Sequence, residues 1–191
     1  MVFDPENLFK VFDTRFELSR YLFVIFLALI SSIIWVMLDH YFKKDYNQKL
    51  KTFAHTILRY HIAIIMVGYG VSKVFLMQFG VIDIDKLEAT VGEQSPMGFM
   101  WSFLSFSKSV TMFSGWVELI GGVLLFFRKT AFLGALLLLG VLTSVVVLDI
   151  GYDVSVTLYA IQLLLLVIVL LSSQLNSLYK FIVLNKKVKA K

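Results

Sequence analysis

Cysteine is absent from the 191-residue sequence. Its absence excludes a disulfide framework, a thiolate metal site and dithiol redox chemistry carried by the chain itself. Charged residues are also scarce, at 16%, whereas 59% of the residues are hydrophobic. A soluble globular domain has about 25% charged residues and roughly 45–50% apolar residues. The composition therefore predicts a membrane protein.

The sequence also lacks a phosphate-binding loop, a nucleophile triad and a metal-ligand cluster. It therefore predicts no self-contained catalytic motif and no metal site. The formal net charge of +5 arises in part from lysines that follow the last apolar run: Lys180, Lys186, Lys187, Lys189 and Lys191. A basic tail next to a membrane span marks the cytoplasmic side and attracts anionic lipid. No nucleic-acid motif accompanies it, so we expect contact with membrane lipids and not with nucleic acid.

Hydrophobic residues are concentrated in five runs, each close to the roughly 20 residues needed to cross a bilayer. The runs are residues 21–38, 56–79, 111–127, 131–148 and 156–172. We therefore expect an all-α polytopic membrane protein. Its expected parts are an N-terminal interfacial segment, first span and basic loop (1–55), a four-helix membrane domain (56–172) and a basic cytoplasmic tail (173–191).

Loop charge predicts the orientation of these spans. Basic segments at residues 43–51, at Arg128 and Lys129, and in the tail alternate with acidic loops at residues 83–93 and 149–153. Because basic loops stay in the cytoplasm, this alternation predicts five spans in the inner membrane, with the N-terminus outside and the C-terminus inside. The first 20 residues lack a signal-cleavage pattern and are expected to lie at the interface as a short amphipathic helix.

Two of the predicted spans contain an ionisable residue. Lys73 lies in the second span and Glu118 in the third, where a charge costs about 2.5–3.5 kcal/mol unless it faces protein or a water-filled cavity. At 1.5 Å per residue both lie about 10 Å from the outer ends of their spans, so we expect them to pair. Arg59, nearer the cytoplasmic end, is expected to extend to the headgroups.

Other polar side chains are predicted at the same depth. Thr143 and Ser144 belong to the fourth span and Gln162 to the fifth. Tyr69 and Trp116 are expected to line the same layer. Residues 97–106, which follow an N-cap at Ser95 and Pro96, are too short to span and are expected to cover this layer. The layer has two interpretations, a structural one that fixes helix register and a ligand site.

These residues resemble the DoxX-like family of small four-helix membrane proteins. The resemblance is carried by Leu58, Arg59, Gly70 and Lys73 in the second span, by GWVELIGGVLLFFRKTAFLGALLL (115–138) and by VVVLDIGYDVSVTLYA (145–160). It covers about residues 56–172, and it implies an antiparallel four-helix bundle with the first span as an addition.

The resemblance also implies a function. Family members include a small subunit associated with thiosulfate:quinone oxidoreduction, which implies a membrane component of a quinone-linked redox or envelope complex with membrane or periplasmic subunits as partners. Quinone is then the expected cofactor, with Lys73, Glu118, Gln162, Tyr69 and Trp116 as the binding residues. The related vitamin K type quinone reductases use catalytic cysteines that this sequence lacks. The alternative is a non-catalytic scaffold or assembly partner of a membrane complex.

Overall fold

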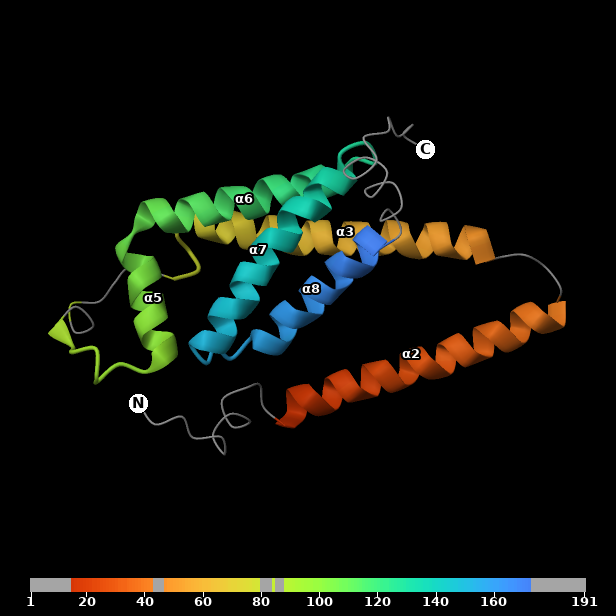
Figure 1. Cartoon of the computed structure of the whole chain (residues 1–191), viewed down its shortest axis with the longest axis horizontal. Helices are drawn as coiled ribbons and strands as arrows, with labels where there is room; N and C mark the ends of the chain where they lie inside the picture. The colour runs from red at the N-terminus through yellow and green to blue at the C-terminus, as the bar shows by residue number, and fades with distance from the viewer. Residues whose placement is uncertain (1–14, 43–46, 80–83, 85–87, 173–191) are drawn as a thin grey trace, which may run out of the picture.

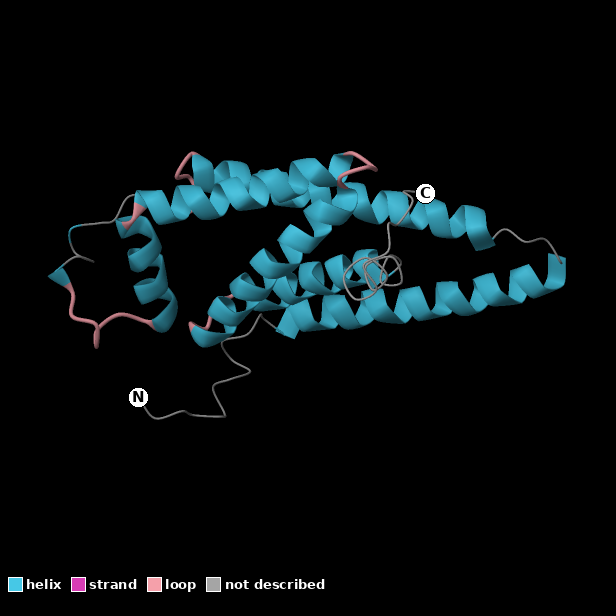
Figure 2. Ribbon diagram, turned by 45° about the horizontal axis from the view of Figure 1, so that its top comes forward, coloured by secondary structure: helices cyan, strands magenta, loops and turns pink. Residues whose placement is uncertain are grey.

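A computed structural model describes residues 15–42, 47–79, 84 and 88–172 (Figure 1). Within these ranges the secondary structure is helical, with no strand (Figure 2). The main helices are α2 (Arg15–Phe42), α3 (Asn47–Val74), α5 (Pro96–Phe106), α6 (Lys108–Phe126), α7 (Ala131–Gly151) and α8 (Thr157–Ser172). The predicted all-α class is confirmed for the described part of the chain.

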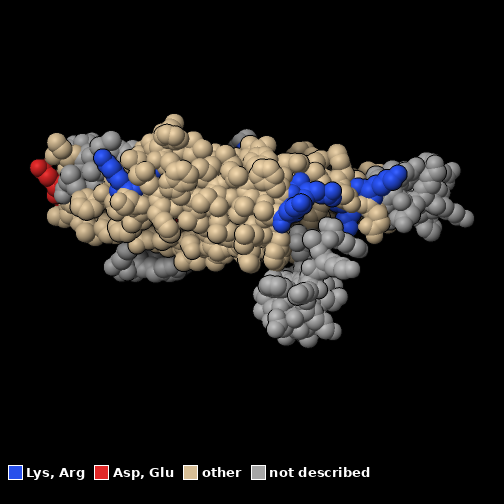
Figure 3. Space-filling model, turned by 90° about the horizontal axis from the view of Figure 1, so that it is seen from above, with Lys and Arg blue, Asp and Glu red and all other residues tan. Residues whose placement is uncertain are grey.

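Three of these helices are long and apolar enough to cross a membrane: Gln48–Val74 in α3, and all of α6 and α7. The apolar part of α2 (Leu18–Ile34) and α8 are shorter apolar helices. On the face drawn in Figure 3, charged side chains stay near the two ends of the molecule and leave a broad uncharged band between them. The chain thus has the composition and shape of a helical membrane protein.

The segment predicted as a basic loop at residues 39–55 is largely helical, which corrects that prediction. Helix α2 continues to Phe42, and α3 begins at Asn47, so Lys49 and Lys51 lie on its first turns. The sequence NQKLKTFAH contains neither glycine nor proline and is rich in good helix formers, so the helix extends beyond its apolar part.

The second predicted span is shorter at its outer end than the sequence suggested. Helix α3 ends at Val74, and Leu76 adopts a left-handed φ of 56°. The Met77 N–H donates to the Ser72 carbonyl over 2.7 Å, so the chain turns back on itself. This turn directs Gln78 and Phe79 toward the bundle instead of along the helix axis.

Glycines set the distance between the helices of the bundle. A Cβ on Gly70 of α3 would lie 2.8 Å from the Gly115 carbonyl oxygen of α6, and a Cβ on Gly115 would lie 2.7 Å from the Lys73 Cβ. A Cβ on Gly134 of α7 would likewise meet the Gly121 carbonyl oxygen at 2.8 Å. Only glycine allows backbones to approach this closely in a membrane protein.

The aliphatic core fills the part of the bundle near the α6–α7 turn. Ile62, Leu125, Leu138 and Val167 are fully buried there and come from four different helices. Helix α2 lies beside this bundle (Figures 1 and 2), and its described apolar side chains such as Phe26 are exposed. None of its described side chains belongs to this core.

Several predictions concern residues outside the described ranges. They include the first part of the interfacial segment, Asp83 and Asp85 of the acidic loop, and the basic tail at residues 173–191.

Candidate ligand-binding site

A cavity of about 360 Å³ lies within the bundle, between the aliphatic core and α5. Its walls come from α3, the turn after α3, α5, α6, α7, the start of α8 and the residues just before α8. The volume falls in the roughly 300–1,000 Å³ range of small-molecule sites. Its polar lining consists of Tyr69, Lys73, Gln78, Ser114, Glu118, Ser144, Asp149 and Tyr159.

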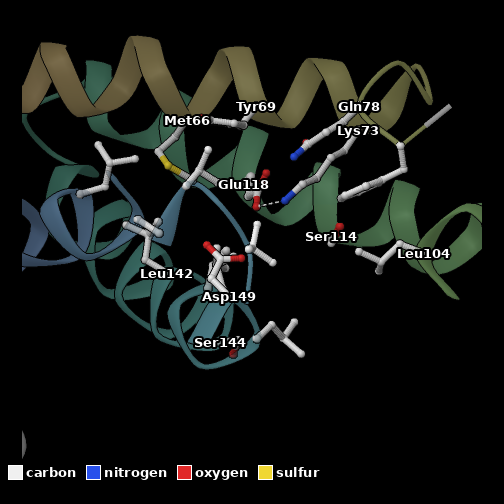
Figure 4. A pocket seen from close by; sticks show the side chains of 18 of the residues that line it. Met66, Tyr69, Lys73, Gln78, Leu104, Ser114, Glu118, Leu142, Ser144 and Asp149 are labelled. Atoms are coloured by element: carbon white, nitrogen blue, oxygen red, sulfur yellow. Dashed lines mark hydrogen bonds and ion pairs between the residues drawn. The ribbon is translucent and has the colours of Figure 1, made fainter. Parts of the chain in front are cut away.

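The predicted pair of charges is present at this cavity. The Lys73 ammonium donates a hydrogen bond to Glu118 Oε1, and the two residues are 8% and 2% exposed (Figure 4). Gly70 and Gly115, one turn from the charged residues, bring α3 and α6 close enough for this contact. Glu118 Oε2 is buried and has no hydrogen-bond partner within the described residues.

One stripe of α3 supplies the cavity wall beside this pair. Met66, Tyr69 and Lys73 all line the cavity, because residues three and four apart share a helix face. Arg59 continues the same stripe but lies away from the cavity. Its guanidinium lies 5.0 Å from the centre of the Tyr60 ring, and the residue is only 8% exposed, so the expectation that it extends to the headgroups is wrong.

The aromatic helix α5 forms another wall of the cavity through Met100, Trp101 and Leu104. It starts as predicted: Ser95 is its N-cap and accepts a hydrogen bond from the Gly98 N–H over 3.1 Å.

Two contacts hold α5 against the turn that follows α3. The Ser105 hydroxyl donates to the Phe79 carbonyl over 3.0 Å, and the rings of Phe79 and Trp101 pack edge to face at 5.5 Å.

Two of the predicted site residues do not line the cavity. On α8 the lining residues are Tyr159, Ala160 and Leu163, and Gln162 lies beside that stripe in a half-buried position. On α6 the lining residues surround Glu118, whereas Trp116 points away and is 48% exposed. At 3.6 residues per turn, correct depth along a helix does not place a side chain on the correct face.

Asp149 and Gln78 are polar lining residues that were not among the predicted site residues. Asp149 was assigned to a surface loop, but α7 continues to Gly151 and leaves Asp149 6% exposed, with its carboxylate facing the cavity (Figure 4). Gln78 was counted as the end of a span, yet the turn at Leu76 brings it to the cavity. The signal for Asp149 was the long apolar run directly before it, which allows the helix to continue.

The cavity has an apolar mouth. Three of its lining residues are strongly exposed: Phe113 at 71%, Val156 at 49% and Leu148 at 43%. They come from α6, from the residue before α8 and from α7. A ligand can therefore place a polar group against Lys73 and Glu118 while an apolar part extends through this mouth.

The arrangement suits binding better than metal chemistry. In the described part of the chain, no three His, Asp or Glu side chains converge to hold a metal ion. The cavity instead offers an ammonium, two carboxylates, hydroxyls and one side-chain amide within mainly apolar walls. A few placed polar groups in an apolar cavity orient a small organic molecule.

No family model matches the chain, and no solved structure matches it. Over 103 residues, the chain is 29% identical to the uncharacterized protein YwoB of Bacillus subtilis (strain 168). The matched stretch covers 54% of this chain and 65% of YwoB, so the chain spans just under two thirds of that relative's length.

Proposed function

We propose that the chain is a DoxX-like inner-membrane protein that binds a quinone-type ring in this cavity, as the membrane component of a quinone-linked redox or envelope complex. The observation that supports the proposal is the buried Lys73–Glu118 pair at the wall of a cavity with an apolar mouth. Ionisable residues within a membrane are functional candidates because their burial is costly. The mouth fits an apolar ligand that arrives from the bilayer.

In this proposal the ring lies against α3 and α6. The Lys73 ammonium has three donor hydrogens, of which one is used by Glu118, so others remain for an oxygen of the ring. Gln78 takes the place that the sequence suggested for Gln162, because its amide oxygen accepts from the Ser72 hydroxyl over 3.4 Å and its amide nitrogen faces the cavity (Figure 4). Trp101 provides a flat apolar wall.

We further propose five spans with the N-terminus outside. The four-helix unit is α3, α6, α7 and α8, and α2 is the added span. Helix α8 has 16 residues, a length of about 24 Å, which is short for a span. The exposed residues Lys49 and Lys51 lie on the first turns of α3, and Arg128 and Lys129 lie in the turn between α6 and α7. Figure 1 shows both places at the end of the bundle away from α5, as a cytoplasmic face requires. A reporter fused after residue 191 is expected to be active only in the cytoplasm, and activity outside overturns this orientation.

Ligand binding is tested with the purified protein in mild detergent. A short-chain benzoquinone and its hydroquinone are each titrated while the thermal unfolding midpoint is measured. A ligand that binds only the folded state raises the midpoint with concentration. If neither form shifts the midpoint and mass spectrometry finds no copurified quinone, the proposed function is wrong.

Two valine-to-tryptophan variants on α7 provide a matched pair. Val145 lines the cavity, whereas Val147 is 64% exposed and does not line it. V145W is expected to fill the cavity and abolish the ligand-dependent shift, while V147W retains it. Equal shifts in both variants place the ligand elsewhere on the protein.

The alternative function is a non-catalytic scaffold or assembly partner. The observation that favours it is α2, whose apolar side chains from Leu22 to Ile34 are exposed along the helix. A membrane partner can pack on such a helix. Site-specific crosslinking from Phe26 in native membranes is expected to give one stoichiometric product if the chain is a scaffold, and lipid adducts only if it is not.

A further inference from the structure

Glu118 presents an unsatisfied acceptor at the cavity. Its Oε1 accepts from Lys73, but Oε2 is buried without a partner within the described ranges, and the residue is 2% exposed. A buried polar atom without a hydrogen bond is costly, and more so when it carries charge. Because Glu118 lines the cavity, a ligand there is positioned to supply the missing donor.

The ionisation of Glu118 decides which partner Oε2 needs. In its charged form the pair sets the ammonium of Lys73 against the carboxylate of Glu118, which offsets part of the cost that burial imposes on both charges. An ionised carboxylate only accepts hydrogen bonds. Oε2 therefore requires an O–H or N–H group, and it does not bind a carbonyl oxygen.

The charges around the cavity favour the same kind of ligand. Among the described residues that line it, Lys73 is the one cation, and Glu118 and Asp149 are two carboxylates. Figure 4 shows the carboxylates of Glu118 and Asp149 facing the same space from α6 and α7. Two carboxylates and one ammonium disfavour an anionic head group and favour one that donates hydrogen bonds.

We infer that the cavity selects ligands whose head group donates hydrogen bonds, with a hydroxyl bound to Glu118 Oε2. This inference rests on the proposed function: of the two forms of a quinone-type ring, the site binds the quinol in preference to the quinone. The quinol places one O–H on Glu118, and its other oxygen accepts from Lys73 or Gln78. The quinone has only acceptor oxygens and leaves Oε2 unsatisfied.

Three ligands with the same ring substituents and different oxygen groups test the inference on the unaltered chain. They are a short-chain benzoquinone, its hydroquinone kept reduced under anaerobic conditions, and the dimethyl ether of that hydroquinone, which has no donor. Because a hydrogen bond to a charged group contributes about 1.5–3 kcal/mol, the hydroquinone is expected to bind about ten- to hundredfold tighter than the ether. The quinone is expected to bind as weakly as the ether.

The outcomes separate this inference from the proposed function. Equal affinities for the three ligands, or tighter binding of the quinone, overturn the donor selection and leave the quinone-type site in place. Absence of binding by all three overturns the proposed function itself. Because the series uses the unaltered chain, it decides the question whether or not variants fold.

A variant locates the selection at Glu118. In E118Q the side chain has no charge and its amide group also donates, so the preference of the hydroquinone over the ether is expected to fall to about threefold or less. Thr143→Ala, which removes a hydroxyl of α7 that donates to the Leu139 carbonyl and does not line the cavity, is the control and is expected to keep the preference. A folded E118Q protein with undiminished preference overturns the assignment to Glu118.

Discussion

The same helices form a filled half and a hollow half of the bundle. In the filled half, around Ile62, Leu125 and Leu138, aliphatic side chains from α3, α6 and α7 meet without exposure. In the hollow half, around Lys73 and Glu118, the helices enclose the cavity. Figures 1 and 2 show that α6 and α7 meet near their connecting turn and diverge toward α5.

This difference shows how the fold supports the candidate site. The glycine contact between α6 and α7 lies in the filled half, at Gly121 and Gly134, whereas α3 and α6 remain close as far as Gly70 and Gly115. The bundle therefore opens only where α7 leaves α6. Rigid packing in one half allows costly polar groups to be held in the other.

The largest expected effect comes from removing one charge of the hollow half. In Glu118→Leu the ammonium of Lys73 is left buried without its partner, and breaking such a pair costs about 3–5 kcal/mol. The double variant K73M/E118L removes both charges and is expected to unfold near the midpoint of the unaltered protein. Chemical unfolding in detergent measures the stability of both variants. If the double variant is as unstable as the single one, Glu118 stabilises the fold through contacts other than its pair with Lys73.

The sequence predicted the Lys73–Glu118 pair because two apolar runs each contained one charge at the same depth, and an unpaired charge in a membrane is costly. It predicted α5 because Ser95 and Pro96 mark a helix start. These features are local, or they depend only on distance along a helix axis.

The missed features depend on helix rotation and on chain turns. Gln162 has the expected depth but lies beside the lining stripe of α8. Gln78 reaches the cavity only because Leu76 adopts a left-handed conformation, which is uncommon outside glycine and has no signal in the sequence. Asp149 reaches it because α7 runs beyond its apolar part.

Two leucine-to-alanine variants on α7 compare the halves directly. Leu138 is fully buried in the filled half, and truncation of a buried leucine costs about 2–5 kcal/mol. Leu148 lines the cavity mouth and is 43% exposed, so the same truncation is expected to cost less than about 1 kcal/mol. The unfolding midpoints of the two variants compare the two losses of stability. Equal losses mean that the mouth is closed and packed in the folded protein.

A glycine pair tests the contact that joins α3 to α6. Gly115→Ala places a Cβ 2.8 Å from the Val74 nitrogen, so the helices must separate, at a cost of about 1–3 kcal/mol. Gly68→Ala on α3 is the control, because nothing lies within 4 Å of its added Cβ. The control is expected to be stabilised by about 0.5–1 kcal/mol through helix propensity. Loss of stability in both variants indicates a contact of Gly68 with another chain or with lipid.

The smallest expected effect concerns the loop that leads into α5 and thus to the hollow half. The Thr90 N–H donates to Glu93 Oε2 over 2.9 Å, and this backbone hydrogen bond holds the pKa of the Glu93 carboxyl below its ordinary value. Because the folded-state pKa is the lower one, the stabilisation is fully present above the pKa of the unfolded chain. It is lost as the pH falls through the folded-state pKa.

The Glu93 carboxylate is fully exposed, so its loss is expected to act locally. Glu93→Gln should raise the hydrogen-exchange rate of the Thr90 amide at neutral pH, relative to the intrinsic rate of an unprotected amide, and the unaltered protein should show the same loss of protection in acid. Glu88→Gln, an exposed change in the same loop, should leave that rate unchanged, and neither should move the ligand affinity of the cavity by more than about twofold. A larger change in affinity for Glu93→Gln means that the loop positions α5 over the cavity. In that case the order of the hollow half depends on the hydrogen bond between Thr90 and Glu93.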